Sequence, residues 1–327
     1  MTRPDPAPGA GRSGASSSRK LISGALLLAA VLFAVWTLQQ NWDDVRSDLA
    51  RLSVLDIVAA AAAYAGSLLL LWRSWANVLS GIGADHVERH DSLTIFFAGQ
   101  LGKYVPGSVW PIVIQSQLGR RNGIAPSMMV NAYALFASLL CGTGAALGVL
   151  ALFGPGVDVA AGLVLVAAVA GVALVVATIH DHGLVRLISW VLARIGRRST
   201  NLRLETPAGL RSVAWATGSW LLLGVHIFAL ARPLGATAGD LGLIIGGFAL
   251  AFVAGLVVVP LPAGAGVREA VLVLTIGAAL GEPAAIAIAL ISRFQMIVVE
   301  LLMATALGVP RAARWARSRS SVDASLE

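Results

Sequence analysis

The stretch GQLGKYVPGSVWP, residues 99–111, decides how this chain folds. It places Lys103 beside a break at Pro106 and Gly107, inside a region that is otherwise apolar. A charged side chain inside a bilayer costs roughly 2.5–3.5 kcal/mol on insertion scales, so this lysine needs a polar partner or a cavity. The proline and glycine therefore predict two helical pieces joined by a break over residues 92–118, rather than one straight helix.

A second apolar region, residues 241–280, has the same character. It is interrupted by PLPAGAGVRE, residues 260–269, in which glycines precede an arginine and a glutamate. We expect both regions to be broken, re-entrant helical hairpins, each returning to the membrane side from which it entered.

The composition identifies an integral membrane protein. Of 327 residues, 57% are hydrophobic and 13% are charged, and the mean hydropathy is +0.81. Uncharged runs of about 20 residues are long enough to cross a bilayer as helices. The sequence therefore predicts an all-α polytopic membrane protein with about six full spans, at Leu21–Leu38, Val54–Trp72, Ser127–Phe153, Val159–Ile179, Ser212–Ala231 and Pro283–Gly308.

The chain divides into three parts. Residues 1–19 are rich in proline, glycine and serine, which predicts a disordered cytoplasmic tail. Residues 20–310 form a single transmembrane domain, whose first span is expected to be an uncleaved helix rather than a signal peptide. Residues 311–327 form a basic tail, also expected in the cytoplasm.

The arginines and lysines predict the topology, because short cytoplasmic loops are enriched in them. With six spans and two re-entrant hairpins, 18 of the 24 basic residues lie on the cytoplasmic side. The same arrangement places both termini in the cytoplasm, and we expect the protein in the cell membrane. Three lie outside, and three remain in the membrane: Lys103, Arg268 and Arg293. The hairpins then open to opposite sides, and each is followed by a similar span, as in the inverted repeats of transporters.

The candidate site residues gather at the two breaks. Glu269 and Glu300 are the acidic residues available to the three cations, and either could pair with Arg268 or Arg293 across helices. A helix that begins inside the membrane also presents free amides that suit a phosphate or carboxylate. The predicted headgroup site comprises Lys103, Pro106, Gly107, Gln115, Gly264, Gly266 and Arg268, and the predicted charge network comprises Glu269, Arg293 and Glu300.

Structural interpretations of the same charges stay open. Lys103 could extend to the cytoplasmic surface and anchor its hairpin. Arg268 with Glu269, or Arg293 with Glu300, could hold the helix bundle together without binding a ligand.

The segments GQLGKYVPGSVW and PLPAGAGVREA, the second followed by a span containing SRF, resemble the two signature segments of the lysylphosphatidylglycerol synthase transmembrane region, a flippase-like membrane family. The resemblance covers roughly residues 20–310. In bifunctional members the membrane part is regarded as a flippase of aminoacylated phosphatidylglycerol, and a soluble C-terminal domain makes that lipid. Because 19 residues follow Gly308 here, the resemblance implies transport without synthesis.

Three functions remain open. The first is a flippase that moves an anionic phospholipid or a polyprenyl-phosphate-linked sugar, with Glu269 or Glu300 carrying a coupling proton or holding the arginines. The second is a membrane-embedded transferase, and the third is a non-transporting partner of cell-envelope synthesis enzymes. We expect membrane lipids as partners, no nucleic acid and no cofactor. We expect no metal site at HDH, residues 180–182, because no cysteine or carboxylate cluster lies nearby, and no thiol chemistry at the single cysteine, Cys141, in an apolar segment.

Overall fold

Backbone amides inside a bilayer have no water to bind, so a chain this apolar must satisfy them within helices. The computed structural model describes residues 42–104, 109–154, 161–180, 203–257, 264 and 266–308, and all regular elements within these ranges are helical. The predicted all-α polytopic fold is thereby confirmed. The predicted span Leu21–Leu38 and both terminal tails lie outside the described residues.

Six helical segments of the described chain are long and apolar enough to cross a membrane. Five correspond to predicted spans, with different ends, and the sixth, η5 with α10, lies in the region expected to re-enter. For example, α3 continues nine residues beyond Trp72, with Arg73 at its polar end. The six segments are α3 (Val54–Gly81), α6 with η2 (Pro126–Leu147 and Gly148–Phe153), α7 (Ala161–His180), α9 with η4 (Thr206–Ala231 and Arg232–Leu234), η5 with α10 (Ala238–Asp240 and Leu241–Val257) and α12 with η7 (Glu282–Met303 and Ala304–Gly308).

Two pairs of helices flank the predicted breaks and pack side by side. The first pair is α4 (Arg89–Leu101), extended by η1 (Gly102–Tyr104), and α5 (Trp110–Arg121). The second pair is α10 and α11 (Val267–Leu280). At 1.5 Å per residue, α4, α5 and α11 are each roughly 18–21 Å long and too short to cross a core of about 30 Å. In the second hairpin α10 is the longer partner, so the two arms are unequal.

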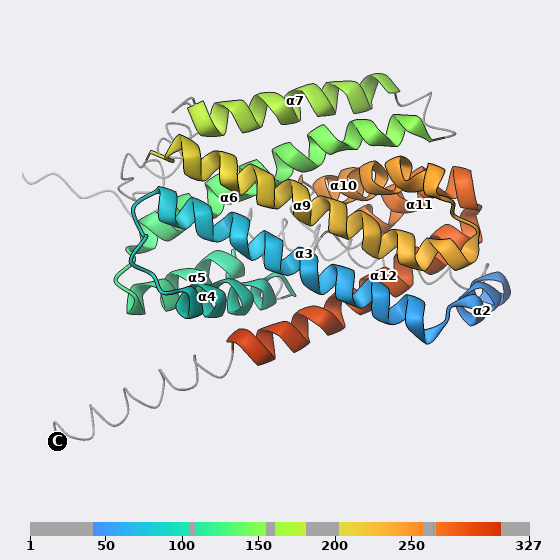
Figure 1. Ribbon diagram of the computed structural model, residues 1–327, viewed down its shortest axis with the longest axis horizontal. Coiled ribbons are helices and arrows are strands. Elements are labelled where there is room, and N and C mark those ends of the chain that lie inside the picture. Colours follow the sequence, from blue (N-terminus) through green and yellow to red (C-terminus); the bar gives the residue numbers. More distant parts are fainter. Residues whose placement is uncertain are drawn as a thin grey trace, which may run out of the picture.

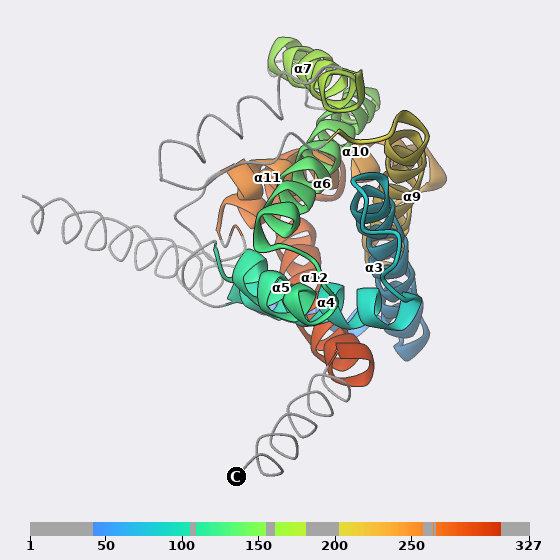
Figure 2. The same cartoon turned by 90° about the vertical axis from the view of Figure 1, so that its left-hand side faces the viewer.

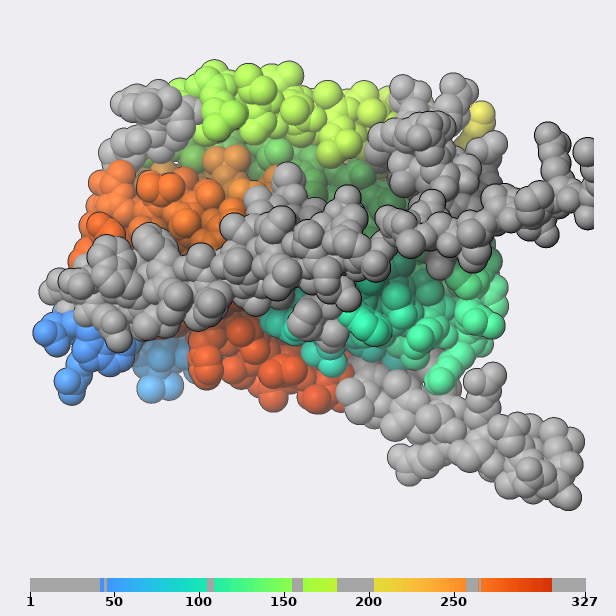
Figure 3. Space-filling view, turned by 180° about the vertical axis from the view of Figure 1, so that it is seen from behind, coloured from blue at the N-terminus to red at the C-terminus, as the bar shows by residue number. Residues whose placement is uncertain are grey.

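The hairpins occupy opposite ends of the bundle (Figures 1 and 2). Seen from behind, α4 and α5 lie at one end, α10 and α11 at the other, and α12 runs between them (Figure 3). The short helix α2 (Trp42–Arg51) lies at the same end as the open side of the α10–α11 hairpin. The described parts of the two helix pairs therefore reach the middle of the bundle from opposite ends.

Close packing of small residues holds the long helices together. The longest seam joins α3 to α9, where Ser74 and Ser212 share a hydrogen bond of 2.8 Å between their hydroxyls. On the other side, a Cβ added to Gly142 of α6 would lie 2.8 Å from the carbonyl oxygen of Gly171 in α7. Such contacts replace the hydrophobic effect, which does not drive helices together in lipid.

Candidate functional site

Glu300 of α12 lies where three elements meet. Its side chain is 2% exposed. Lys103 of η1 approaches Oε1 at 2.6 Å, and the hydroxyl of Tyr104 donates to Oε2 at 2.6 Å. Tyr64 of α3 also donates its hydroxyl to Oε1. One buried carboxylate is thus bound by the tip of the first hairpin and by a spanning helix, which satisfies the charge away from water.

The position of Tyr64 shows how deep this carboxylate lies. Tyr64 is the eleventh residue of α3, which begins at Val54. Ten steps of 1.5 Å place it roughly 15 Å along the helix axis, which is half of a hydrocarbon core of about 30 Å. Tyr64, and with it Glu300, therefore lies about half the thickness of a hydrocarbon core away from the start of α3.

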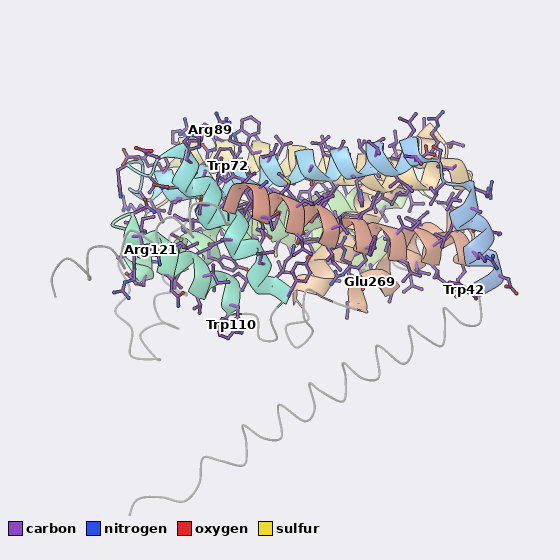
Figure 4. The ribbon with its side chains drawn as sticks, turned by 90° about the horizontal axis from the view of Figure 1, so that it is seen from below. Trp42, Trp72, Arg89, Trp110, Arg121 and Glu269 are labelled. Carbon is purple, nitrogen blue, oxygen red and sulfur yellow. The ribbon has the colours of Figure 1, made fainter. Side chains whose placement is uncertain are left out.

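Glu269 and Arg293 form the second ion pair of the site. Arg293 Nη1 lies 3.6 Å from Glu269 Oε1, across the interface between α12 and α11. The other oxygen of Glu269 accepts a 2.7 Å hydrogen bond from the backbone amide of Gly266, at the first turn of α11. Both side chains are about one quarter exposed, so this pair borders the open side of the site. Figure 4 shows Glu269 between the two ends of the bundle.

Arg268 differs from the other cations because no carboxylate in the described chain lies within 4 Å of it, although it is only 8% exposed. Its guanidinium carbon lies 4.6 Å from the ring centre of Phe248 and 5.4 Å from that of Phe252, both on α10. Its Nη2 donates to the sulfur of Met296 at 2.6 Å. Aromatic faces and a thioether stabilise a cation weakly compared with a carboxylate.

The tip of the second hairpin depends on glycine. Gly264 and Gly266 have φ angles of +67° and +86°, which L side chains rarely adopt. A Cβ added to Gly264 would also lie 2.7 Å from the Cα of Gly255 in α10. Gly264 therefore lies directly against α10, where no side chain would fit.

The sequence matches a known family of membrane proteins. The profile of the family described as Lysylphosphatidylglycerol synthase TM region matches residues 21–304 of the chain. The chain belongs to this family. A search of curated proteins with the whole sequence found no match. Membership and the membrane-spanning helices establish an integral membrane protein in a lipid-related process.

In this lysylphosphatidylglycerol synthase TM region protein, the expected charged residues lie around α12. Glu269 pairs with Arg293, one of the interhelical pairings that the sequence left open. Glu300 pairs instead with Lys103, which the spacing did not indicate, and Arg268 pairs with neither carboxylate. The reason is that each hairpin tip approaches α12 at a different height.

The other predicted residues have different places. Gln115 is 1% exposed and packs against Gly99. A Cβ added to Gly99 would lie 2.6 Å from Cγ of Gln115. Among the described residues, no hydrogen bond joins Gln115 to Glu300, and its Oε1 has no partner there. Pro106 and Gly107 lie outside the described residues.

Sequence reasoning missed both tyrosines. The chain has three tyrosines, and two of them, Tyr64 and Tyr104, donate to Glu300. Tyr104 is adjacent to Lys103 and could have been included with the break. Tyr64 follows a run of alanines, and its hydroxyl reaches another helix.

A buried histidine was also missed. His226 of α9 is fully buried, with Nδ1 2.9 Å from the carbonyl oxygen of Ala60 and Nε2 2.9 Å from the hydroxyl of Ser292. Its ring centre is 5.5 Å from that of Tyr64. These contacts connect α3, α9 and α12 directly behind the ion pairs, so the histidine supports the site from its packed side.

The site carries an excess of positive charge. Lys103, Arg268 and Arg293 face the two carboxylates Glu269 and Glu300, which gives a formal net charge of +1 for these five side chains. Electrostatic interactions connect Arg268 with Arg293 and with both carboxylates. A negatively charged group entering the site would balance the excess and give Arg268 the partner that the described part of the chain does not supply.

Proposed function

We propose that the protein is a lipid flippase that moves a lipid with a phosphate-bearing headgroup between the two leaflets of the membrane. The observation that carries this proposal is Arg268: a buried arginine at a hairpin tip, without a carboxylate partner in the described chain, inside a site of net positive charge. An arginine fork matches phosphate oxygens in a bidentate geometry.

The two hairpins suggest how the site reaches both leaflets. Lys103 belongs to the tip that approaches from one end of the bundle, and Arg268 follows the tip that approaches from the other. Both contact α12, through Glu300 and Met296 respectively. A phosphate bound between these cations is reached from one side by movement of the first hairpin and from the other side by movement of the second. This is alternating access around a fixed midplane site.

The partly exposed ion pair favours an amphipathic substrate. Arg293 and Glu269 are about one quarter exposed, and the neighbouring Phe294 is 70% exposed. A headgroup can enter beside them while its acyl or polyprenyl chain stays in the bilayer. The substrate classes that fit are anionic phospholipids, aminoacylated phosphatidylglycerol as in the family name, and polyprenyl-phosphate-linked sugars.

We place the protein in the cell membrane with the end that bears Arg89, Arg120 and Arg121 in the cytoplasm, because that end is the more basic. Both termini then lie in the cytoplasm. Replacing Cys141 with alanine and adding single cysteines at Ser80 or Thr237, at opposite ends of the bundle, tests this. The Ser80 cysteine is expected to react with a membrane-impermeant maleimide only after the cells are opened.

Transport is tested with purified protein in vesicles that contain fluorescent phosphatidylglycerol or a fluorescent polyprenyl phosphate. Reduction of the label in the outer leaflet by dithionite measures exchange between leaflets. We expect the wild-type protein to accelerate exchange of at least one of these lipids, the R268Q variant to lose this acceleration, and the R120Q variant to keep it. Exchange no faster than in empty vesicles for both lipids refutes the flippase, and a covalent lipid product formed from a labelled donor would support the transferase instead.

A further inference from the structure

A second concentration of positive charge lies far from Glu300, where α3 ends and α4 begins. A pocket of about 230 Å³ opens there to the surface. Figure 4 shows Trp72 and Arg89 together near one end of the bundle. The pocket is lined by Trp72, Arg73, Ala76, Leu79, Ser80, Ala84, Asp85, Val87, Arg89 and Ser92.

Two arginines share one tryptophan in this pocket. The guanidinium carbons of Arg73 and Arg89 lie 4.9 and 5.6 Å from the ring centre of Trp72. The indole is fixed by a 3.2 Å hydrogen bond from its Nε1 to the hydroxyl of Ser92, which in turn donates to the carbonyl oxygen of Arg89. Within the described ranges neither guanidinium has a carboxylate within 4 Å. Both cations are therefore positioned by the fold while their hydrogen-bond donors stay open to a ligand.

The depth of the pocket coincides with the phosphate layer of a bilayer. From Val54 to Trp72, eighteen helical steps of 1.5 Å give roughly 27 Å, close to the thickness of the hydrocarbon core. Asp56 lies in the first turn of α3, and the next charged residue of the helix is Arg73. A tryptophan followed by an arginine at this depth lies where lipid phosphates do.

Asp85 adds a negative charge to the lining of the pocket. Asp85 is one of the residues that line the pocket together with the arginines, and within the described ranges it forms an ion pair with neither. A headgroup that carries only a negative charge leaves this carboxylate without a partner. A headgroup with both a phosphate and a primary ammonium group complements both parts of the pocket, with the phosphate at the arginines and the ammonium at Asp85.

We propose that this pocket binds the headgroup of a phospholipid of the adjacent leaflet and that Asp85 favours headgroups with a primary ammonium, such as phosphatidylethanolamine. This lipid is distinct from the transported one: Trp72 lies eight residues, or roughly 12 Å along α3, from Tyr64 at the midplane site. The pocket lies between α3 and α4, and α4 continues into η1, which carries Lys103. The bound lipid thereby fixes the base of the first hairpin.

Native mass spectrometry of the purified protein tests the proposal, with titrations of phosphatidylethanolamine, phosphatidylglycerol and inorganic phosphate. We expect wild type to bind phosphatidylethanolamine more tightly than phosphatidylglycerol. The R73Q/R89Q variant is expected to weaken phosphatidylethanolamine binding by about tenfold or more, because it removes both phosphate donors. D85N is expected to bind both lipids equally, whereas the R120Q control, at the same end but outside the pocket, keeps the wild-type preference.

Two further measurements keep the outcome decisive. The R73K/R89K variant retains both charges and is expected to recover part of the binding, which a folding defect would not allow. R268Q is expected to bind this lipid as wild type does, so a failure of the transport proposal leaves this one intact. The proposal is refuted if R73Q/R89Q binds phosphatidylethanolamine as tightly as wild type, or if inorganic phosphate competes so well that the lipid adds no affinity.

Discussion

The ion pair between Lys103 and Glu300 is the most direct test of the midplane site. E300Q keeps the shape of the side chain and one acceptor oxygen, but it removes the charge that Lys103 approaches at 2.6 Å. K103Q removes the other charge and leaves Glu300 with the hydroxyls of Tyr64 and Tyr104. The double variant K103Q/E300Q removes both charges together, so the three variants and wild type form a thermodynamic cycle.

The expected magnitudes follow from burial. Removing one partner of a fully buried pair destabilises a protein by roughly 3–5 kcal/mol, because an uncompensated charge stays inside. Lys103 keeps a second acceptor, Gln100 Oε1 at 3.5 Å, once Glu300 is neutral. We therefore expect E300Q to lower the free energy of unfolding by about 2 kcal/mol. K103Q is expected to lower it by about 3 kcal/mol, because Glu300 is 2% exposed and cannot reach water.

The double variant should be less destabilised than the sum of the two single variants. We expect a coupling energy of about 2 kcal/mol, measured by reversible unfolding in mixed detergent micelles with increasing sodium dodecyl sulfate. The matched control is a cycle of Asp48 and Arg51, an exposed pair 3.3 Å apart on α2, for which at most about 0.5 kcal/mol is expected. A coupling energy below about 0.5 kcal/mol for Lys103 and Glu300 would refute the argument that they compensate each other in a dry interior.

Three further substitutions test the parts of the site separately. G264A is expected to destabilise the protein by about 2 kcal/mol or more, because its Cβ would lie 2.7 Å from α10 at a φ of +67°. The control is G277A, a helical position where the nearest atom to a Cβ lies at 3.6 Å. It should be neutral or stabilising in the same unfolding assay. Y64F removes a hydroxyl from a buried carboxylate and should lower stability by about 2 kcal/mol, while Y133F should change it by less than about 0.5 kcal/mol. R268K keeps the charge but loses the planar fork, so vesicle transport should fall by about tenfold with unchanged folding; transport equal to wild type would exclude bidentate binding.

The hairpins were predictable because their signals are local. A proline or glycine indicates where a helix is interrupted, and a charge beside it indicates that this point needs a polar partner or cavity. Lys103 and Arg268 could be recognised in this way without knowledge of any other helix. The lengths of the two helices of the second hairpin could not be predicted, because residues 241–259 are apolar without a polar residue to mark a helix end. The glycines at 264 and 266 indicate the position of the break but not the extent of either helix.

The pairing of charges could not be predicted, because it depends on the height at which separate helices meet. Arg293 and Glu300 are seven residues apart on α12, and this spacing indicates that they share a face but not which partner each contacts. Tyr64 was hidden for the same reason: within an alanine-rich helix, no periodicity distinguishes a tyrosine directed at Glu300 from one directed at lipid. His226 shows the limit most clearly, since its contacts come from two helices more than sixty residues away in sequence.

The two ion pairs have opposite polarity, and this has a consequence for movement of the hairpins. The first hairpin contributes a cation, Lys103, to an anion of α12, while the second contributes an anion, Glu269, to a cation of α12. In the proposed transport cycle, a phosphate bound between Lys103 and Arg268 would compensate Lys103 as that lysine leaves Glu300, and the carboxylate would keep the hydroxyl of Tyr64. Without a phosphate, the same separation would leave both Lys103 and Glu300 without their partner charge and would cost about 3 kcal/mol or more. The substrate would therefore lower the barrier to opening.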